Sequence, residues 1–419
     1  MNSFAYGALW FFIFTLPWER ILTLPGVYIV SKASGAFALA VVLFAVLVSG
    51  RVRRLQSFHG AALIFVVWAG IRALLTDYHR LGFPGKYWTF VQLLLVLWMI
   101  WELAPNRARL LGLFSAYVLG AYVAALDTIL LYRSQGELLR RFAAGGSDPN
   151  DLAMMLALAL PMAWYLGMNY RKPLVVWACR GYLIVGLLAL GLTGSRGGMV
   201  AAMVGLSIVP LTLTQLSAGK RVLGTVLICA GIAVVFAYTP TTLIERLAST
   251  GTDLSDAHVG GRGPIWAAGF KAFTQQPFFG YGTGMFKTAV NPYGINQVAH
   301  NAFLSVLVEQ GMVGLLFYLA MFGLVFLSIL NLRSFDRRFT LVLYATTIVA
   351  MLPLTWEDDK AVWFILGALI GLCNAPQPAP QPATWHPPRP VPLRQGAGIG
   401  GLARGRAAPT PPGRLDARG

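Results

Sequence analysis

Apolar runs long enough to cross a lipid bilayer recur along most of the chain, and this feature limits the possible folds more than any other. Hydrophobic residues make up 57% of the 419 residues and charged residues only 12%, whereas about a quarter of the residues in soluble domains are charged. A helical span needs about 20 apolar residues. The sequence therefore predicts an all-α polytopic membrane protein and excludes an ordinary soluble enzyme.

We predict about twelve transmembrane helices. Their approximate ranges are 4–18, 34–49, 59–75, 88–104, 110–132, 150–168, 175–193, 197–215, 222–238, 301–331, 339–353 and 361–374. Nine of these helices fall in residues 1–238 and three in 301–374, separated by a loop at 239–300. That loop is the only segment outside the helices that is large enough to cover a site.

The basic residues predict the orientation of these helices. Thirteen lysines and arginines lie in about 40 residues of alternate short loops, with Asp336 as the only acid there. The opposite loops spread a similar number over about 115 residues. Since positive charge is retained in cytoplasmic loops, we predict that both termini are cytoplasmic and that the 239–300 loop lies on the far side.

The tail at 375–419 differs in composition from the rest of the chain. It holds 11 of the 24 prolines, seven glycines and six arginines, with Asp416 as its one acid. This composition predicts a disordered basic extension. Although the whole chain has a net charge of +17, membrane sorting and contact with anionic lipid explain that charge better than a nucleic-acid partner does.

The far side nevertheless carries many cations, against the usual bias of membrane topology. They are Arg133, Arg140, Arg141, Arg196, Arg246, Arg262, Lys271 and Lys287, together with His300. Because charge near apolar depth is costly, such residues are candidates for a functional site. Three of them, Arg196, Arg262 and His300, are each predicted at the start of a helix.

The first helix start is in residues 192–198, which read LTGSRGG. We predict a tight hairpin in which Ser195 caps the following helix and Arg196 stands in its first turn. Free backbone N–H groups and the helix dipole make such a place suitable for a phosphate. The alternative is an interfacial arginine that extends to lipid headgroups.

The second helix start is at Arg262, which is followed by Pro264 at the first helical position. Residues 265–276 are predicted to form a short amphipathic helix on the membrane surface. Its predicted apolar face comprises Ile265, Trp266, Gly269, Phe270 and Phe273. An ordinary loop arginine is the alternative for Arg262.

The third helix start is at His300, where the longest span begins. Asn301, Ser305 and Glu309 share one stripe of this helix at 100° per residue. Arginines nearby would lower the pKa of His300 and keep its imidazole neutral, as a general base requires. The alternative is a structural histidine that is simply hydrogen-bonded.

Two acidic segments are predicted to be structural. Asp148 precedes Pro149 and is predicted to cap the sixth helix. Residues 357–360, which read EDDK, are predicted to form a solvent-exposed turn in which Lys360 is paired, and a metal site is the alternative. The three cysteines are too scattered for a metal or redox site. We therefore predict no metal and no cofactor.

A cluster of cations with a neutral base suits a dianionic ligand, such as a diphosphate carried on a lipid tail. Guanidinium groups would stabilise the charge that grows on a departing diphosphate, where a divalent metal often acts. The predicted substrate-binding residues are Arg196, Arg262, Ser195, Asn301, Arg140, Arg141 and Lys287. With His300 as general base and no second nucleophile, we predict a metal-independent single displacement with inversion.

These motifs also carry a family resemblance. The run 192–198, Arg262 with Trp266, and His300-Asn301 with Glu309 follow one another as in the O-antigen ligase/polymerase superfamily, which the chain resembles over about residues 145–330. The resemblance implies a GT-C-like glycosyltransferase of the bacterial inner membrane with a periplasmic active site. In ligases it implies transfer of a polysaccharide from undecaprenyl diphosphate to the lipid A–core oligosaccharide, as a step in lipopolysaccharide biosynthesis.

Other functions stay open at this stage. An O-antigen or exopolysaccharide polymerase would use the same donor with a growing glycan as acceptor, and a related enzyme could glycosylate protein. A transporter of a polyprenyl-linked sugar or an anion is a different class. Transporters place charged residues near the membrane midplane in repeated halves, whereas these charges gather at one face and no internal repeat is evident.

Overall fold

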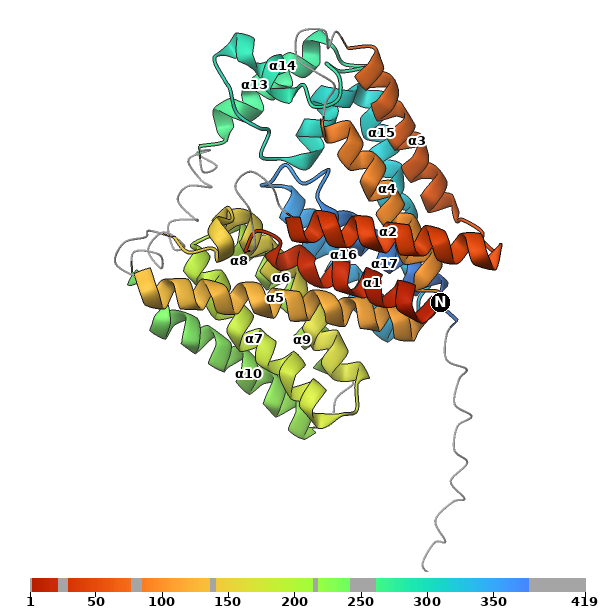
Figure 1. Ribbon diagram of the computed structural model, residues 1–419. Helices are drawn as coiled ribbons and strands as arrows, with labels where there is room; N and C mark the ends of the chain where they lie inside the picture. Colours follow the sequence, from red (N-terminus) through yellow and green to blue (C-terminus); the bar gives the residue numbers. More distant parts are fainter. Residues whose placement is uncertain are drawn as a thin grey trace, which may run out of the picture. The chain divides into compact units, whose positions relative to one another are not determined.

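The computed structural model describes helices along most of the chain as far as Pro376 (Figure 1). The described residues are 2–21, 29–76, 85–135, 141–213, 218–241 and 261–376. Arg140, Arg246, residues 242–260 of the predicted far-side loop and the predicted tail from Gln377 onwards lie outside them.

Every regular element in the described residues is a helix. The α-helices are α1 (Asn2–Thr15), α2 (Ile29–Ser49), α3 (Ser57–Leu74), α4 (Gly85–Leu103), α5 (Arg107–Gln135), α6 (Pro149–Asn169), α7 (Pro173–Thr193), α8 (Arg196–Leu206), α9 (Ile208–Leu213), α10 (Ala218–Tyr238), α13 (Gly263–Gln275), α14 (Phe286–Val290), α15 (Ala302–Leu330), α16 (Ser334–Met351) and α17 (Lys360–Asn374). Three short 3₁₀ helices are η1 (Leu16–Trp18), η3 (Ala144–Gly146) and η4 (Asn291–Tyr293).

The apolar ranges predicted from the sequence all coincide with helices, the range 197–215 being divided between α8 and α9. Among the described residues, seven segments are long and apolar enough to cross a membrane. They are Val30–Ser49, Ser57–Leu74, Arg107–Gln135, Pro149–Asn169, Pro173–Thr193, Arg196–Leu213 and Ala302–Leu330. The protein is therefore an all-helical, multi-pass membrane protein, and the predicted count of twelve spans stays a prediction.

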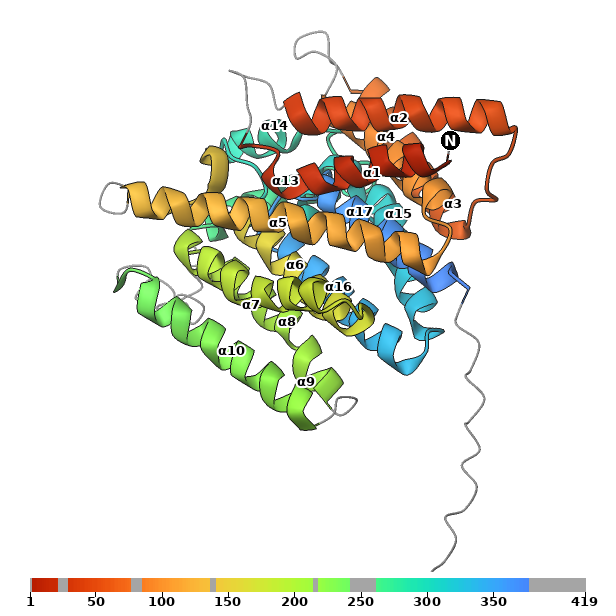
Figure 2. The same cartoon turned by 60° about the horizontal axis from the view of Figure 1, so that its bottom comes forward.

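Two apolar helices lie in the interior of the bundle. α6 packs against α5, α7, α8 and α16, and the side chains of its central residues are almost all buried. α17 is likewise buried along most of its length. A helix that is apolar on all sides belongs in such a position. By contrast, α10 packs on the outside of α7 (Figure 2).

A second, smaller core joins α13 and α14 to the first turns of α15. Ile265, Ala268 and Ala272 of α13 are buried there with Leu304 and other residues of α15. The predicted helix is therefore present. Within its predicted apolar face Ile265 is buried against α15, whereas Phe270 is 55% exposed, and the position of this face on the membrane stays a prediction. The buried side is centred on small alanines because α13 packs closely on α15.

Gly311 interrupts α15, and the loop at residues 277–284 packs against the interruption. Gly311 has φ +68° inside the helix, a conformation that costs little only for glycine. The backbone N–H of Met312 donates to Pro277 O at 2.8 Å, and that of Gly282 donates to Glu309 O at 2.8 Å. The turn at residues 277–284 is thereby held against the broken helix.

Candidate functional site

The site is formed by loops that precede several helices, beginning with α6. Asp148 caps α6, and its carboxylate accepts from the backbone N–H groups of Asn150 at 2.7 Å and Asp151 at 3.3 Å. Carboxylates are favoured at this position because they pair backbone donors that the helix leaves free. The predicted cap at Asp148 is confirmed.

The hairpin between α7 and α8 meets the start of α6. Gly194 ends α7 with φ +58°, and Ser195 caps α8 by accepting from Gly198 N at 3.2 Å. The Ser195 hydroxyl also donates to Asn150 Oδ1 at 3.1 Å. Arg196 is the first residue of α8. The predicted hairpin and cap are thus confirmed, and the starts of α6 and α8 lie side by side.

Arg141 holds these two helix starts together. Its Nε donates to the carbonyl of Thr193 at 2.7 Å, and its Nη2 donates to Asn150 Oδ1 at 2.8 Å. Asn150 therefore accepts from both Arg141 and Ser195. Since these contacts fix the loops on either side, the structure gives Arg141 a positioning role.

His300 is held in an unusual backbone conformation at the start of α15. Its φ is +45°, and the described residues contain no other non-glycine residue with positive φ. Such a conformation is strained for a residue with a Cβ and persists only where its surroundings enforce it. Two contacts do so: Asn301 caps α15 by accepting from Leu304 N at 2.9 Å, and His300 N donates to Thr355 Oγ1 at 3.0 Å.

The loop at residues 352–359 connects three of the helix starts. Thr355 contacts His300, as described above. Trp356 Nε1 donates to Asp151 Oδ1 at 3.1 Å in the first turn of α6. Pro353 lies so close to Gly197 of α8 that a Cβ at Gly197 would be 3.1 Å from it. This loop therefore brings the starts of α6, α8 and α15 to one place.

Arg262 joins this group from the start of α13. Burial lowers the pKa of His300, the guanidinium of Arg262 lowers it further, and the carboxylate of Asp148 opposes both. Burial also lowers the pKa of Arg262, again opposed by Asp148. The three ionisable groups are therefore within electrostatic reach of one another, and the half-buried imidazole of His300 is held neutral.

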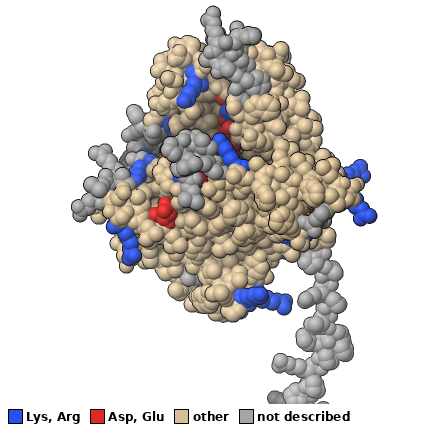
Figure 3. Space-filling model, viewed as in Figure 1, with Lys and Arg blue, Asp and Glu red and all other residues tan. Residues whose placement is uncertain are grey.

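The predicted residues divide into three groups. Five lie at the converging helix starts: Ser195, Arg196, Arg262, His300 and Asn301. Arg141 positions them, while Lys287 lies on the exposed side of α14, where no hydrogen bond or ion pair within the described chain connects it to the group. Figure 3 shows a hollow in this face, lined by basic and acidic side chains, below the region of α13 and α14.

Convergent helix starts form an environment for an anion. The free N–H groups and dipoles of α6, α8, α13 and α15 add to the charges of Arg196 and Arg262. Such an arrangement binds a phosphate and stabilises negative charge that develops in a reaction. His300 adds a neutral base, so the site can combine anion binding with proton removal.

The comparison with known protein families agrees with this chemistry. Residues 181–319 match the family model described as O-antigen ligase. Over these residues the chain is similar to O-antigen ligases. The matched segment, called the O-antigen ligase domain below after the model that it matches, includes Ser195, Arg196, Arg262, His300 and Asn301. The match supports a membrane enzyme of the O-antigen ligase or polymerase type. No curated protein matches it at a significant level.

Asp148 and Asn150 precede the O-antigen ligase domain in the sequence and were predicted only as part of a helix cap. The structure adds them to the site because Asn150 contacts Ser195 and Asp148 acts on His300. Thr355, which follows the domain, was not predicted at all. Its neighbour Trp356 was the available signal, since a buried indole N–H needs an acceptor such as Asp151.

A buried charge cluster supports the site from behind. Lys86 Nζ of α4 lies 2.8 Å from Glu309 Oε2 and 3.2 Å from Ser305 Oγ, and it forms a short ion pair with Glu357. Glu357 is 0% exposed, so the predicted solvent-exposed turn is wrong at this residue. Lys360 is paired, as predicted, and its partner is Glu19 at 2.6 Å.

Neither the site nor this cluster resembles a metal centre. Within the described chain, no group of three His, Cys, Asp or Glu side chains is arranged to hold a metal ion. The carboxylates of Glu309 and Glu357 face the ammonium of Lys86, which occupies the position that a cation would take. The described residues contribute positive charge to the site through Arg196 and Arg262 at helix starts.

Proposed function

We propose that the protein is an inverting, metal-independent O-antigen ligase that transfers a polysaccharide from undecaprenyl diphosphate to lipid A–core oligosaccharide. The observation that carries the proposal is the meeting of Arg262, a neutral His300 and the helix start at Arg196 around one anion-binding region. The O-antigen ligase domain covers all three residues. Chemistry on a lipid-linked glycan also fits a protein with several membrane-spanning helices.

The arginines act on the leaving group. As the glycosidic bond breaks, its electrons pass to the diphosphate oxygen, which gains negative charge. Arg196 and Arg262 stand at helix starts, so guanidinium and backbone N–H donors are fixed where that charge develops. Donors fixed in advance contribute a few kcal/mol each to the transition state. This is the contribution that a divalent cation makes in other transferases.

His300 acts on the attacking group. Its neutral imidazole accepts the proton of the acceptor hydroxyl as the oxygen attacks the anomeric carbon from the face opposite the diphosphate. The strained backbone at His300 and the hydrogen bond from its backbone N–H to Thr355 hold the main chain that carries the imidazole. With one displacement, the anomeric configuration inverts.

The proposed location follows from the basic loops. The helix starts of the site lie opposite the loops that carry most of the arginines, so we place the site on the periplasmic face of the inner membrane and both termini in the cytoplasm. A polymerase would use the same donor site with a glycan acceptor. A transporter is disfavoured, since the charges gather at helix starts rather than at broken helices near the midplane.

Reconstitution tests the reaction directly. The protein in liposomes is supplied with undecaprenyl-diphosphate glycan and lipid A–core in the presence of a chelator. We expect glycan attached to lipid A–core, with the anomeric configuration opposite to that in the donor. Product formed only between two donor molecules would show a polymerase, and product with retained configuration would contradict the mechanism.

The pH dependence of the activity gives a second test, in which two variants are expected to shift the pH profile in opposite directions. His300 works in its neutral form, so activity falls as the pH drops through its lowered pKa. Arg262→Gln removes a charge that lowers this pKa, so the acid limb of kcat/KM is expected at higher pH. Asp148→Asn removes a charge that raises it but keeps a helix cap, so the limb is expected at lower pH.

The two variants control for each other. Arg262→Gln also slows turnover, so the position of the limb is compared rather than the rate. If the acid limbs of the two variants move in the same direction along the pH axis, or if neither moves, His300 is not the group that titrates.

A further inference from the structure

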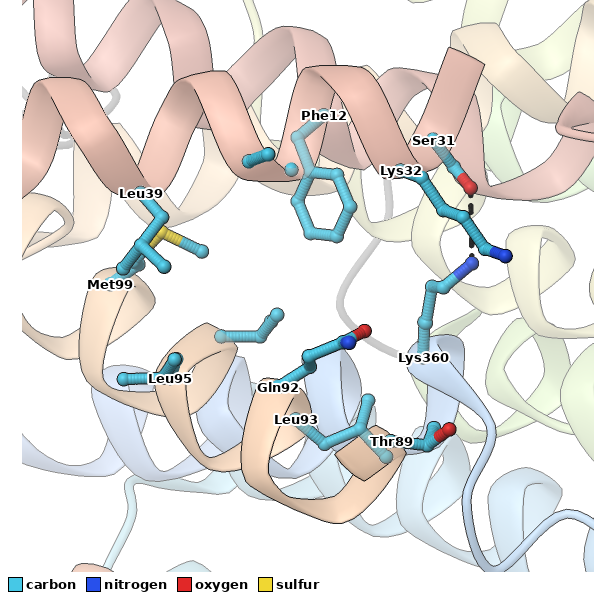
Figure 4. A pocket seen from close by; sticks show the side chains of 13 residues that line it. Phe12, Ser31, Lys32, Leu39, Thr89, Gln92, Leu93, Leu95, Met99 and Lys360 are labelled. Atoms are coloured by element: carbon cyan, nitrogen blue, oxygen red, sulfur yellow. Dashed lines mark hydrogen bonds between the residues drawn. The ribbon is translucent and has the colours of Figure 1, made fainter. Parts of the chain in front are cut away.

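An open groove lies between the helix pair α1–α2 and α4, outside the catalytic region. It has a volume of about 420 Å³, which is within the usual range for ligand sites. Figure 4 shows Lys32 and Lys360 at one end, Leu39 and Met99 at the other, and Phe12 between them. The groove therefore has a cationic end and an apolar end.

The cationic end has a built geometry. Lys360 is held by Glu19 Oε2 at 2.6 Å and by Ser31 Oγ at 3.0 Å. Lys32, one residue after Ser31, is exposed and adds a second ammonium beside it (Figure 4). Because Lys360 is paired with Glu19, the exposed ammonium of Lys32 supplies the positive charge at this end of the groove, which suits a phosphate at the membrane surface.

The interior of the groove changes in polarity with depth. Thr89 and Gln92 of α4 come first, and Leu93, Val96 and Met99 follow toward the other end. From Thr89 to Met99 the helix rises about 15 Å at 1.5 Å per residue. Gln92 is exposed within an apolar helix, and its amide points into the groove (Figure 4). An amide at that depth needs a polar partner.

This order of groups matches the parts of an acylated lipid. Phosphate would meet Lys32 and Lys360, an ester or amide carbonyl would meet Gln92, and a hydrocarbon chain would lie against the apolar end. A prenyl diphosphate has hydrocarbon directly beyond its phosphates and offers nothing to Gln92. The groove therefore fits a phosphorylated acyl lipid better than a polyprenyl carrier.

The groove also leads toward the catalytic region. Lys32, Lys360 and Thr89 all lie in the first turns of their helices, so the cationic end is at one membrane face. A smaller cavity next to it is lined by Glu19, Arg20, Ser147, Asp151 and Asp359. Asp151 belongs to the α6 start that contacts Ser195 through its neighbour Asn150. A head group held at the lysines would extend along this line toward His300.

We propose that the groove of α1, α2 and α4 binds the acceptor lipid, a phosphorylated and acylated glycolipid, with a phosphate at Lys32 and Lys360 and an acyl chain beside Gln92. Its identification as the acceptor rests on the proposed function, whereas the lipid binding does not. The lipid-diphosphate donor and the acceptor lipid would then reach the catalytic region from different sides of the first turn of α6.

Binding of lipid A to the detergent-purified protein, measured by native mass spectrometry, tests the proposal. Lys32→Ala is expected to weaken binding about fivefold, since one interfacial lysine contributes to that extent. Ala36→Trp fills the groove and is expected to abolish binding, and Gln92→Leu weakens it. Lys271→Ala, an exposed lysine elsewhere, is the matched control. Thermal unfolding checks that each variant is folded.

Two further lipids show which part of lipid A the groove recognises. Dephosphorylated lipid A and undecaprenyl phosphate are both expected to bind more weakly at the groove than lipid A. In transfer assays, Lys32→Ala should raise the KM for lipid A–core and leave the KM for the donor unchanged. Absence of lipid A binding, equal binding of lipid A by folded Ala36→Trp, or a greater loss of undecaprenyl phosphate than of lipid A binding in Ala36→Trp would overturn the proposal. Groove-dependent binding without any transfer would instead contradict only the proposed function.

Discussion

Replacing His300 with alanine is expected to lower kcat about 10²–10⁴-fold, the usual contribution of a general base, while the KM for the donor changes little. In the proposed mechanism the base acts on the acceptor hydroxyl, whereas Arg196 and Arg262 hold the diphosphate. The measurement is steady-state transfer from lipid-diphosphate glycan to lipid A–core in liposomes.

The backbone of His300 supplies a control for folding. Its φ of +45° is strained for alanine as for histidine, but glycine adopts it freely. His300→Gly should therefore unfold at the same temperature as the parent protein or higher, while remaining inactive. It also leaves a space in which added imidazole can act as the base.

Chemical rescue separates the two roles of the histidine. Imidazole is expected to restore part of the activity of His300→Gly, with a pH dependence that follows the added base. If imidazole restores nothing, and if loss of activity parallels a lower unfolding temperature, then His300 is a structural residue and the mechanism is wrong.

The features of the site that depend only on residues close by in the sequence were predicted correctly. Ser195 and Asp148 were predicted as helix caps and are caps in the structure, and Pro264 stands at the start of its helix. Caps are local, since the side chain pairs with N–H groups two or three residues further on. The positions of Arg196 and Arg262 at helix starts follow from the same short-range rule.

The relations between these helix starts could not be predicted in that way. Asp148 and His300 meet only because the helices pack together, and no pattern within either segment indicates the other. The strained φ of His300 was also hidden, because positive φ is usually signalled by glycine. It is imposed by Thr355 and Asn301, which act through the tertiary structure and a helix cap.

The turn at residues 357–360 shows why charge is ambiguous in a membrane protein. Three consecutive acids, Glu357, Asp358 and Asp359, indicate a solvent-exposed loop when only the neighbouring sequence is considered. In the structure, however, Glu357 is fully buried. Burial also raises the pKa of Asp359 to about 7, with the carboxylate of Glu19 adding to the effect. The partner that permits burial of Glu357 is Lys86, which belongs to a helix distant in the sequence.

Lys86→Met is therefore expected to have the largest effect on stability. The ammonium of Lys86 faces Glu309 and Glu357 in the interior. Its removal leaves two carboxylates without a counter-charge, and breaking a buried ion pair in this way costs about 3–5 kcal/mol. Thermal unfolding in detergent measures the loss. Lys271→Met, on the exposed side of α13, should unfold like the parent protein.

Neutral partners should recover much of that loss. In the triple variant Lys86→Met/Glu309→Gln/Glu357→Gln the two carboxylates that pair with Lys86 are made neutral, and Asp358 is left as the acid near that position. Replacing a buried ionic group by neutral side chains is often tolerated. Because Glu357 lies in the loop whose Thr355 holds His300, turnover should recover less than stability does. A Lys86→Met protein as stable as the parent would show that the buried carboxylates need no ammonium, and that the loop behind His300 is held by its other contacts.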